Sequence, residues 1–311
     1  MRESLHPPIP SRVILSSLEP IGVGTSDCES LNGYINRLAA VHGVTERELS
    51  DYVRSLPRME GERYKSDGSL QPYWGTAPGL TGLRLARLTG VPSVAVLGMP
   101  WGDHTIALRR YVRKSPVWCS ACWQEDIEAG RPTYHRLVWN FCFHERCHRH
   151  GTLLEGACPR CGSTEQRGPD GWAPPVGCRQ CGSPLMRATT PADEHQEGQT
   201  PSAAWDAHHA ELFADLVRDM PALGNEPRWP DLEWAYELAK LRTGLEFQMD
   251  VVRQLRTNSV YLSRSRRPEW ERQVISLGAV IKFAAAAGVP ILEVLKAGKC
   301  RSRFMGEPEL Y

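Results

Sequence analysis

The sequence lacks several features that would place it in common classes of protein. None of its apolar runs approaches the roughly 18 residues of a membrane-spanning helix. No apolar signal segment opens the chain, so we expect a cytoplasmic protein rather than one exported to an oxidising compartment. Formal net charge is only +1, so no overall positive field draws the chain onto nucleic acid.

Familiar catalytic patterns are also missing. The sequence shows no paired carboxylates, no Ser-His-Asp order and no glycine loop that would cradle a phosphate, so we expect no enzyme. At 311 residues, with 41% hydrophobic and 23% charged residues, the chain is an ordinary globular protein with room for two or three domains. Its 10 tryptophans and 24 prolines favour rigid interaction surfaces.

The strongest positive signal is a set of metal-ligating residues that occur in pairs, with two other residues between the members of each pair. The pairs are Cys119 and Cys122, Cys147 and His150, Cys158 and Cys161, and Cys178 and Cys181. Two donors at this spacing lie on one tight turn and grip one face of a tetrahedral ion. Sequential pairing therefore predicts two Zn²⁺ ions, one for the first two pairs and one for the last two. Both ligand shells are full, which predicts structural rather than catalytic zinc.

Two alternatives concern these cysteines. A disulfide framework would suit a secreted protein, which the start of the chain does not favour. Cys142 and His144 could replace Cys147 and His150 in the first site. We favour the latter pair because it keeps the two-residue gap and precedes Gly151, which permits the turn; Cys142, between two phenylalanines, then belongs to the core. A zinc-stapled nuclease that uses His144, Glu145 or His148 would be an enzymatic alternative. The full ligand shells of both zinc sites disfavour it, because they leave no open position on the metal.

The pattern predicts a mainly α-helical fold with small zinc-ribbon or zinc-finger modules. We expect an extended arm (1–20), a helical domain of helix-turn-helix type (21–115), a double zinc module (116–185), a linker (186–204) and a C-terminal helical domain (205–311). Helix, glycine turn and helix recur around Gly43, Gly90 and Gly288.

Helix starts can be placed from capping boxes. Ser26 with Glu29, and Thr45 with Glu48, have the spacing in which side chains satisfy the first free amides of a helix. Further helices are expected over residues 205–220 and 231–257. The expected recognition helices near the front carry acidic or apolar residues, which suit a DNA groove poorly.

Six arginines form the densest positive patch. They are Arg253, Arg256, Arg264, Arg266, Arg267 and Arg272. Such a patch is either a solvated loop or a contact for nucleic acid or an acidic partner, and we carry it as a candidate nucleic-acid site.

Two stretches together resemble the TniQ family, which includes the related TnsD proteins. The first runs from Cys28 to Ala39; the second combines the Cys119 pair, a central Trp139, the Cys147–Gly151 turn and the Cys158 pair. The resemblance covers about residues 10–185. The serine after Cys119, the alanine before Cys158 and the extra donors Cys142 and His144 depart from the family pattern.

The resemblance implies a bacterial protein that selects targets for transposons. TniQ proteins join a targeting element, such as a CRISPR-associated RNA-guided effector, to the AAA+ ATPase TnsC, often as dimers. TnsD-like members instead bind attachment-site DNA directly. We therefore expect a non-catalytic adaptor, with a direct reader of target DNA as the alternative.

Overall fold

The computed structural model describes part of the chain. The described ranges are 14–57, 79–99, 112–113, 115–142, 144–164, 177–178, 180–186, 201–223, 280–281, 284–285 and 288–297. Over these residues the protein is mainly helical, with four isolated β-bridges and no strand. Within the same ranges, every helix is too short or too polar to span a membrane.

The first helix, α1 (Leu31–Val41), begins later than its expected capping box. Ser30 is the N-cap, and its hydroxyl accepts from the Gly33 amide at 3.0 Å. The expected pair of Ser26 and Glu29 is therefore wrong. The Glu29 carboxylate instead accepts two hydrogen bonds from the Arg37 guanidinium, at 2.6 and 2.7 Å. Glu29 is buried, and a buried carboxylate needs a partner of opposite charge.

Helix α2 (Glu46–Ser55) follows a turn at Gly43, whose φ of +65° is a conformation that glycine adopts easily. The capping box of Thr45 and Glu48 is confirmed in full. Leu49 and Val53 face the core. On the exposed side, Asp51 pairs with both Arg47 and Arg54.

Helix α3 (Gly79–Thr89) turns at Gly90 into η1 (Pro92–Gly98), which is a 3₁₀-helix. The two pack closely at Gly82, where an added Cβ would lie 3.1 Å from the Ala95 carbonyl oxygen. The arm that precedes α1 is tied to this pair, since the Leu15 amide donates to the Leu88 carbonyl at 3.0 Å.

The cysteine-rich segment contains α4 (Ser120–Glu128) and η4 (Leu137–Asn140) around a tryptophan cluster. Trp118 stacks on Trp123 with ring centroids 5.4 Å apart, and Trp123 meets the edge of Trp139 at 6.1 Å. All three are fully buried. The apolar surface that these three rings bury supplies the core that so short a segment needs.

Main-chain hydrogen bonds join this segment to the start of α1. The Ser30 amide donates to the His135 carbonyl, and the Leu137 amide to the Cys28 carbonyl, both at 2.8 Å. The buried side chains on both sides of residue 115 form one hydrophobic cluster. The N-terminal helices and the cysteine-rich segment thus share a core.

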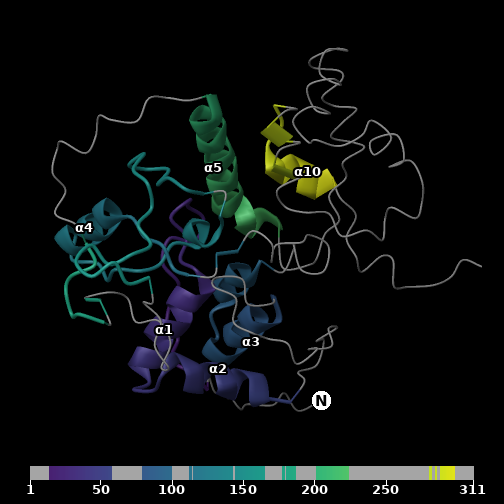
Figure 1. Cartoon of the computed structure of the whole chain (residues 1–311). Helices are drawn as coiled ribbons and strands as arrows, with labels where there is room; N and C mark the ends of the chain where they lie inside the picture. Colours follow the sequence, from purple (N-terminus) through teal and green to yellow (C-terminus); the bar gives the residue numbers. More distant parts are fainter. Residues whose placement is uncertain are drawn as a thin grey trace, which may run out of the picture.

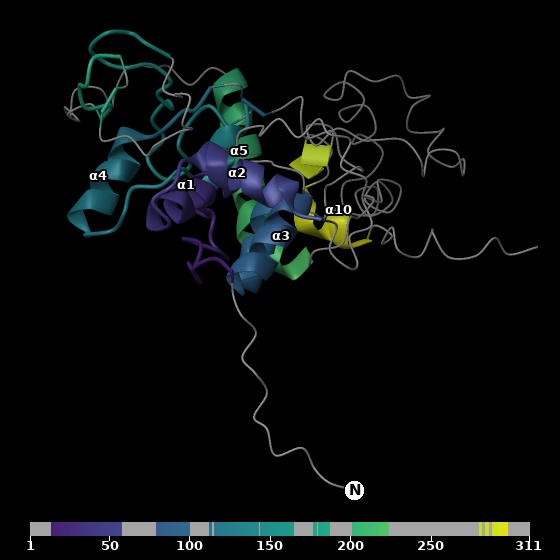
Figure 2. The same ribbon diagram turned by 90° about the horizontal axis from the view of Figure 1, so that it is seen from below.

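The described C-terminal part includes α5 (Pro201–Asp219), η6 (Met220–Leu223), and α10 (Ile291–Ala297) after a turn at Gly288. Helix α5 begins inside the segment expected to be a linker. Phe213 packs on Phe141 with ring centroids 4.5 Å apart, which docks α5 on η4. Helices α5 and α10 lie side by side, above α1–α3 in Figure 1, and Figure 2 shows α4 on the opposite flank from α10.

Two expectations fall outside the described residues. They are the helix over 231–257 and the arginine patch that comprises Arg253, Arg256, Arg264, Arg266, Arg267 and Arg272.

Candidate metal centres

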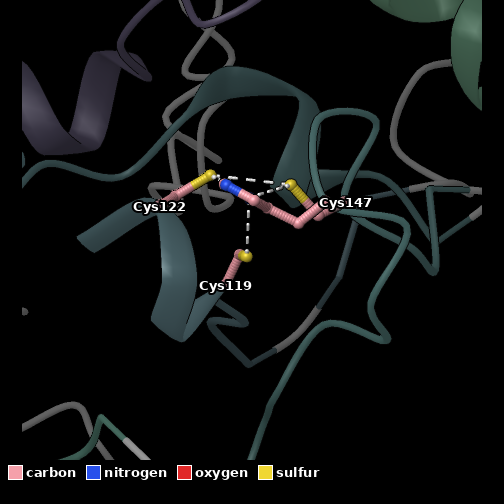
Figure 3. A group of neighbouring side chains, drawn as sticks. Cys119, Cys122 and Cys147 are labelled. Carbon is pink, nitrogen blue, oxygen red and sulfur yellow. Dashed lines mark hydrogen bonds between the residues drawn. The ribbon is translucent and has the colours of Figure 1, made fainter. Parts of the chain in front are cut away.

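The first group of ligands brings together two separate parts of the cysteine-rich segment. Cys119 is the N-cap residue of α4 and Cys122 lies in its first turn, whereas Cys147 and His150 come from a tight turn. Figure 3 shows the three sulfurs pointing toward one another. His150 Nδ1 lies 3.5, 3.4 and 3.5 Å from the sulfurs of Cys119, Cys122 and Cys147.

These separations fit a tetrahedral ion. With Zn–S bonds of about 2.3 Å and Zn–N bonds of about 2.0 Å, neighbouring ligand atoms stand about 3.5 to 3.8 Å apart. The Cys122 and Cys147 sulfurs are 3.5 Å apart, far beyond the roughly 2.05 Å of a disulfide. All described cysteines are free thiols. The arrangement therefore matches a metal centre, not a disulfide framework.

The second group has the same geometry and is built from two turns. Cys158 and Cys181 have sulfurs 3.7 Å apart, and Cys161 and Cys178 have sulfurs 3.6 Å apart. The four ligand atoms lie within 4.8 Å of one another, as they do in the first group. The structure thus brings all eight predicted ligands together in the two predicted sets of four.

Three of the four ligand pairs share one backbone turn. After Cys147, Cys158 and Cys178, the amide four residues on donates to the cysteine carbonyl at 2.8, 2.9 and 2.7 Å. The donating residue is a glycine each time, with φ of +66°, +71° and +71°. The cysteine amide in turn donates to the carbonyl of the Thr or Ser that follows the glycine. The pattern Cys-x-x-Cys/His-Gly-Thr/Ser therefore encodes a ready-made turn for two ligands.

The pair from α4 is held differently. The Trp123 amide donates to the Cys119 carbonyl at 3.2 Å as the helix begins, so both sulfurs project from a helix N-terminus. The partial positive charge of a helix N-terminus favours thiolates. The Thr152 hydroxyl also lies 3.6 Å from the Cys119 sulfur.

Hydrogen bonds among the three thiols of the first group shift their proton affinities. Contacts from Cys122 and Cys147 lower the pKa of Cys119, because they stabilise its thiolate. Hydrogen bonds with Cys119 and Cys147 raise the pKa of Cys122, and the hydrogen bond with Cys119 raises the pKa of Cys147 to about 11. A divalent cation would favour the thiolate at all three positions.

Burial distinguishes the two groups. The sulfur-bearing residues of the first group, Cys119, Cys122 and Cys147, are each at most 1% exposed. In the second group Cys158 and Cys178 are buried, whereas Cys161 and Cys181 are exposed. The first centre belongs to the core, while the second lies at the surface.

A carboxylate orients the histidine of the first group, and sequence reasoning did not identify it. Glu125 Oε1 lies 2.8 Å from His150 Nε2, while Glu125 Oε2 lies 2.6 Å from Arg149. The hydrogen bond to His150, with the charge of Arg149, lowers the pKa of Glu125. Such a carboxylate fixes the tautomer that leaves Nδ1 free to bind metal. The sequence feature that could have identified Glu125 is its position, one helical turn after the ligand Cys122.

The alternative donors of the first site lie outside the ligand group. Cys142 is exposed, so its expected place in the core is wrong. The chain turns there, and Cys142 lies outside the hydrophobic cluster that holds Phe141. His144 is fully buried, and burial lowers its pKa to about 3, but its ring packs at 5.5 Å from that of His148.

Residues 20–154 match the model of the TniQ family. The match includes α1, α2 and the whole first ligand group, and it ends before Cys158, so the second group lies beyond it. A comparison with curated proteins found no match. Residues 20–154 of this chain therefore form a TniQ domain, and the proteins of that family act in selecting the target of DNA transposition.

Proposed function

We propose that this protein is a non-catalytic adaptor that links a targeting complex to a TnsC-type AAA+ ATPase during transposition. The targeting side is an RNA-guided effector or target-site DNA. In this role the chain recognises two partners and performs no chemistry itself. The TniQ match over residues 20–154 is the observation that carries the proposal.

The ligand groups support a structural role for the metals, which we propose to be Zn²⁺. Each group supplies four donors, and a tetrahedral zinc with four protein ligands has no open position for water. Three thiolates with one imidazole, and four thiolates, are soft donor sets that suit this ion. Metal binding then holds the turns in place and stabilises a segment whose core is small.

The surface of the N-terminal helices suits protein contact better than a DNA groove. Both exposed arginines of α2 are paired with Asp51, which leaves little positive charge for phosphates. Large apolar side chains are exposed on this part of the molecule: Val41 and Val44, beside the turn between α1 and α2, are 56% and 40% exposed, and Tyr52 of α2 is 40% exposed. Apolar exposure of this kind is common at protein interfaces.

The test is size-exclusion chromatography with light scattering on the zinc-loaded protein. One sample contains a TnsC-type ATPase with ATP, a second the ATPase without nucleotide, and a third duplex DNA alone. The mass of the free protein also reports whether it is a dimer. We expect a complex with the ATP-bound ATPase and weak, sequence-independent DNA binding.

The opposite result would favour the alternative function. Tight, sequence-selective binding to duplex DNA in the absence of other proteins, with a steep dependence on salt, would identify a TnsD-like reader of an attachment site. Absence of any complex with the ATPase, under conditions where the ATPase binds its other partners, would contradict the adaptor role.

A further inference from the structure

The turn that carries Cys147 and His150 touches the N-terminal helical region through its two middle residues. His148 Nε2 lies 3.5 Å from Asp27 Oδ1, and the Arg149 guanidinium lies 3.5 Å from Asp27 Oδ2. These residues occupy the positions between the two ligands. Any ion that fixes the turn therefore also fixes the side chains that reach Asp27.

Asp27 lies at a structural junction. It precedes Cys28, Glu29 and the N-cap Ser30, and therefore leads directly into α1. Its carboxylate also receives Arg136 Nε at 3.0 Å, and its carbonyl oxygen accepts from the Tyr134 hydroxyl at 3.0 Å. Asp27 thus joins the start of α1 to two separate parts of the cysteine-rich segment.

The contacts of Asp27 connect to charged groups in the core and at the metal centre. Arg136 is 1% exposed and also pairs with Asp126 of α4 at 3.2 Å. Arg149 contacts Glu125, which in turn holds His150. A buried guanidinium needs its carboxylates, because an unpaired charge in the core is costly. The network is therefore sensitive to the loss of any one of its partners.

We propose that Asp27 is a docking residue through which metal binding at the first centre stabilises the N-terminus of α1. Binding of the ion orders the Cys147-x-x-His150 turn, and the ordered turn presents His148 and Arg149 to Asp27. The second centre differs in its attachment. Its segment is fastened at Trp118, whose amide and indole nitrogens donate to the carbonyls of Glu155 at 2.8 Å and Leu185 at 3.2 Å. This inference is independent of the proposed function.

Linkage makes the coupling reciprocal. If metal binding strengthens the docking of α1, the docking of α1 must strengthen metal binding by the same factor. A change at Asp27 should therefore alter both the stability of the N-terminus of α1 and the binding of the ion. A residue that only helped α1 to pack would alter the stability of the helix and leave metal binding unchanged.

The first measurement is hydrogen exchange of the full-length, zinc-loaded protein, followed by mass spectrometry. In Asp27→Asn, peptides covering residues 28–40 should exchange faster than wild type by about three- to thirtyfold, as expected for loss of a coupled ion-pair contact. The matched control is Asp51→Asn, since Asp51 also pairs with two arginines but lies on the exposed side of α2. It should leave exchange over residues 28–40 unchanged.

The second measurement is the rate at which each variant loses zinc to a chromophoric chelator. Wild-type protein should show two phases, and Cys161→Ser, which lacks a ligand of the second centre, identifies the phase of the first. Asp27→Asn should speed that phase several-fold, and Asp51→Asn should not.

The proposal requires both effects in Asp27→Asn with two ions bound per chain at the start. Unchanged exchange over residues 28–40 would overturn it. So would faster exchange combined with unchanged zinc release, because that result would make Asp27 a packing residue without a link to the metal. Both measurements begin from folded, loaded protein, so neither depends on the metal-free state being folded.

Discussion

At the scale of single residues, His150 shows how the first centre is tuned. One ring nitrogen faces the three sulfurs and the other meets Glu125, so both nitrogens have partners and the ring orientation is set. Arg149 holds the other oxygen of Glu125. The ligand set is therefore supported from outside by a carboxylate and a guanidinium.

Replacement of Glu125 by alanine should weaken metal binding at the first centre by about 10- to 100-fold, as is typical when a carboxylate behind a metal-bound histidine is lost. Competition with a chelator of known affinity measures the effect. Glu128→Ala is the control, because Glu128 is on the same helix and contacts only Gln124 in the described hydrogen bonds. Equal affinities of the two variants would contradict the role of Glu125.

Cys158→Ser should reduce the bound zinc from two ions per chain to one and destabilise the second centre, because metal binding supplies much of the folding free energy of such modules. Elemental analysis of the purified protein gives the ion count. Cys142→Ser should keep both ions, since Cys142 is exposed and outside the ligand groups. Two ions in Cys158→Ser would show that the ligand assignment is wrong.

At the scale of elements, glycines determine how closely the parts approach. The three ligand turns need a glycine with positive φ, and Gly82 allows α3 to lie directly on the backbone of η1. Close contact of this kind leaves no room for a side chain. The helical part is thus built around backbone contacts as well as around apolar side chains.

Gly82→Ala should therefore lower the free energy of unfolding by about 1 to 3 kcal/mol, the usual cost of overpacking. Its Cβ would lie 3.1 to 3.3 Å from backbone atoms of Ala95, Gly98 and Val94, which cannot rotate away. Urea denaturation measures the change, with Ser50→Ala on the partly exposed side of α2 as the control. A variant as stable as wild type would show that η1 can shift at little cost.

At the scale of the whole molecule, the N-terminal helices and the first metal centre share one core. His135 lies at this junction, with its ring nitrogens 3.3 Å from the Ser30 hydroxyl and 3.1 Å from the Val117 carbonyl. Burial lowers its pKa to about 3. The folded protein therefore holds this histidine neutral.

Stability should fall as the pH is lowered from about 6.5, the ordinary pKa of histidine, toward 3. Over this range the unfolded chain binds protons that His135 and His144 in the folded protein do not, so each contributes a slope of at most about 1.4 kcal/mol per pH unit. Urea denaturation at pH 7.5, 6.5 and 5.5 in excess zinc measures it. His135→Gln should reduce the slope, whereas exposed His208→Gln should not; equal slopes in both would contradict the prediction.

The sequence by itself determined the ligand pairs, the capping box at Thr45 and the glycine turns. These features are local: two donors three positions apart, or a side chain that meets an amide three residues on, have the same geometry in any fold. The family could be recognised for the same reason, because each of its motifs is short and local.

Only the tertiary structure decided which contacts join these parts. Asp27 and Arg149, or Trp118 and Leu185, are far apart in the chain, and no spacing rule pairs them. Glu29 was misread as a helix cap because its true partner, Arg37, becomes favourable only once both are removed from water. Cys142 was misplaced because the two phenylalanines beside it suggested a core, whereas the turn of the chain there exposes it. Local rules fix turns and caps, while long-range packing and burial of charge decide the rest.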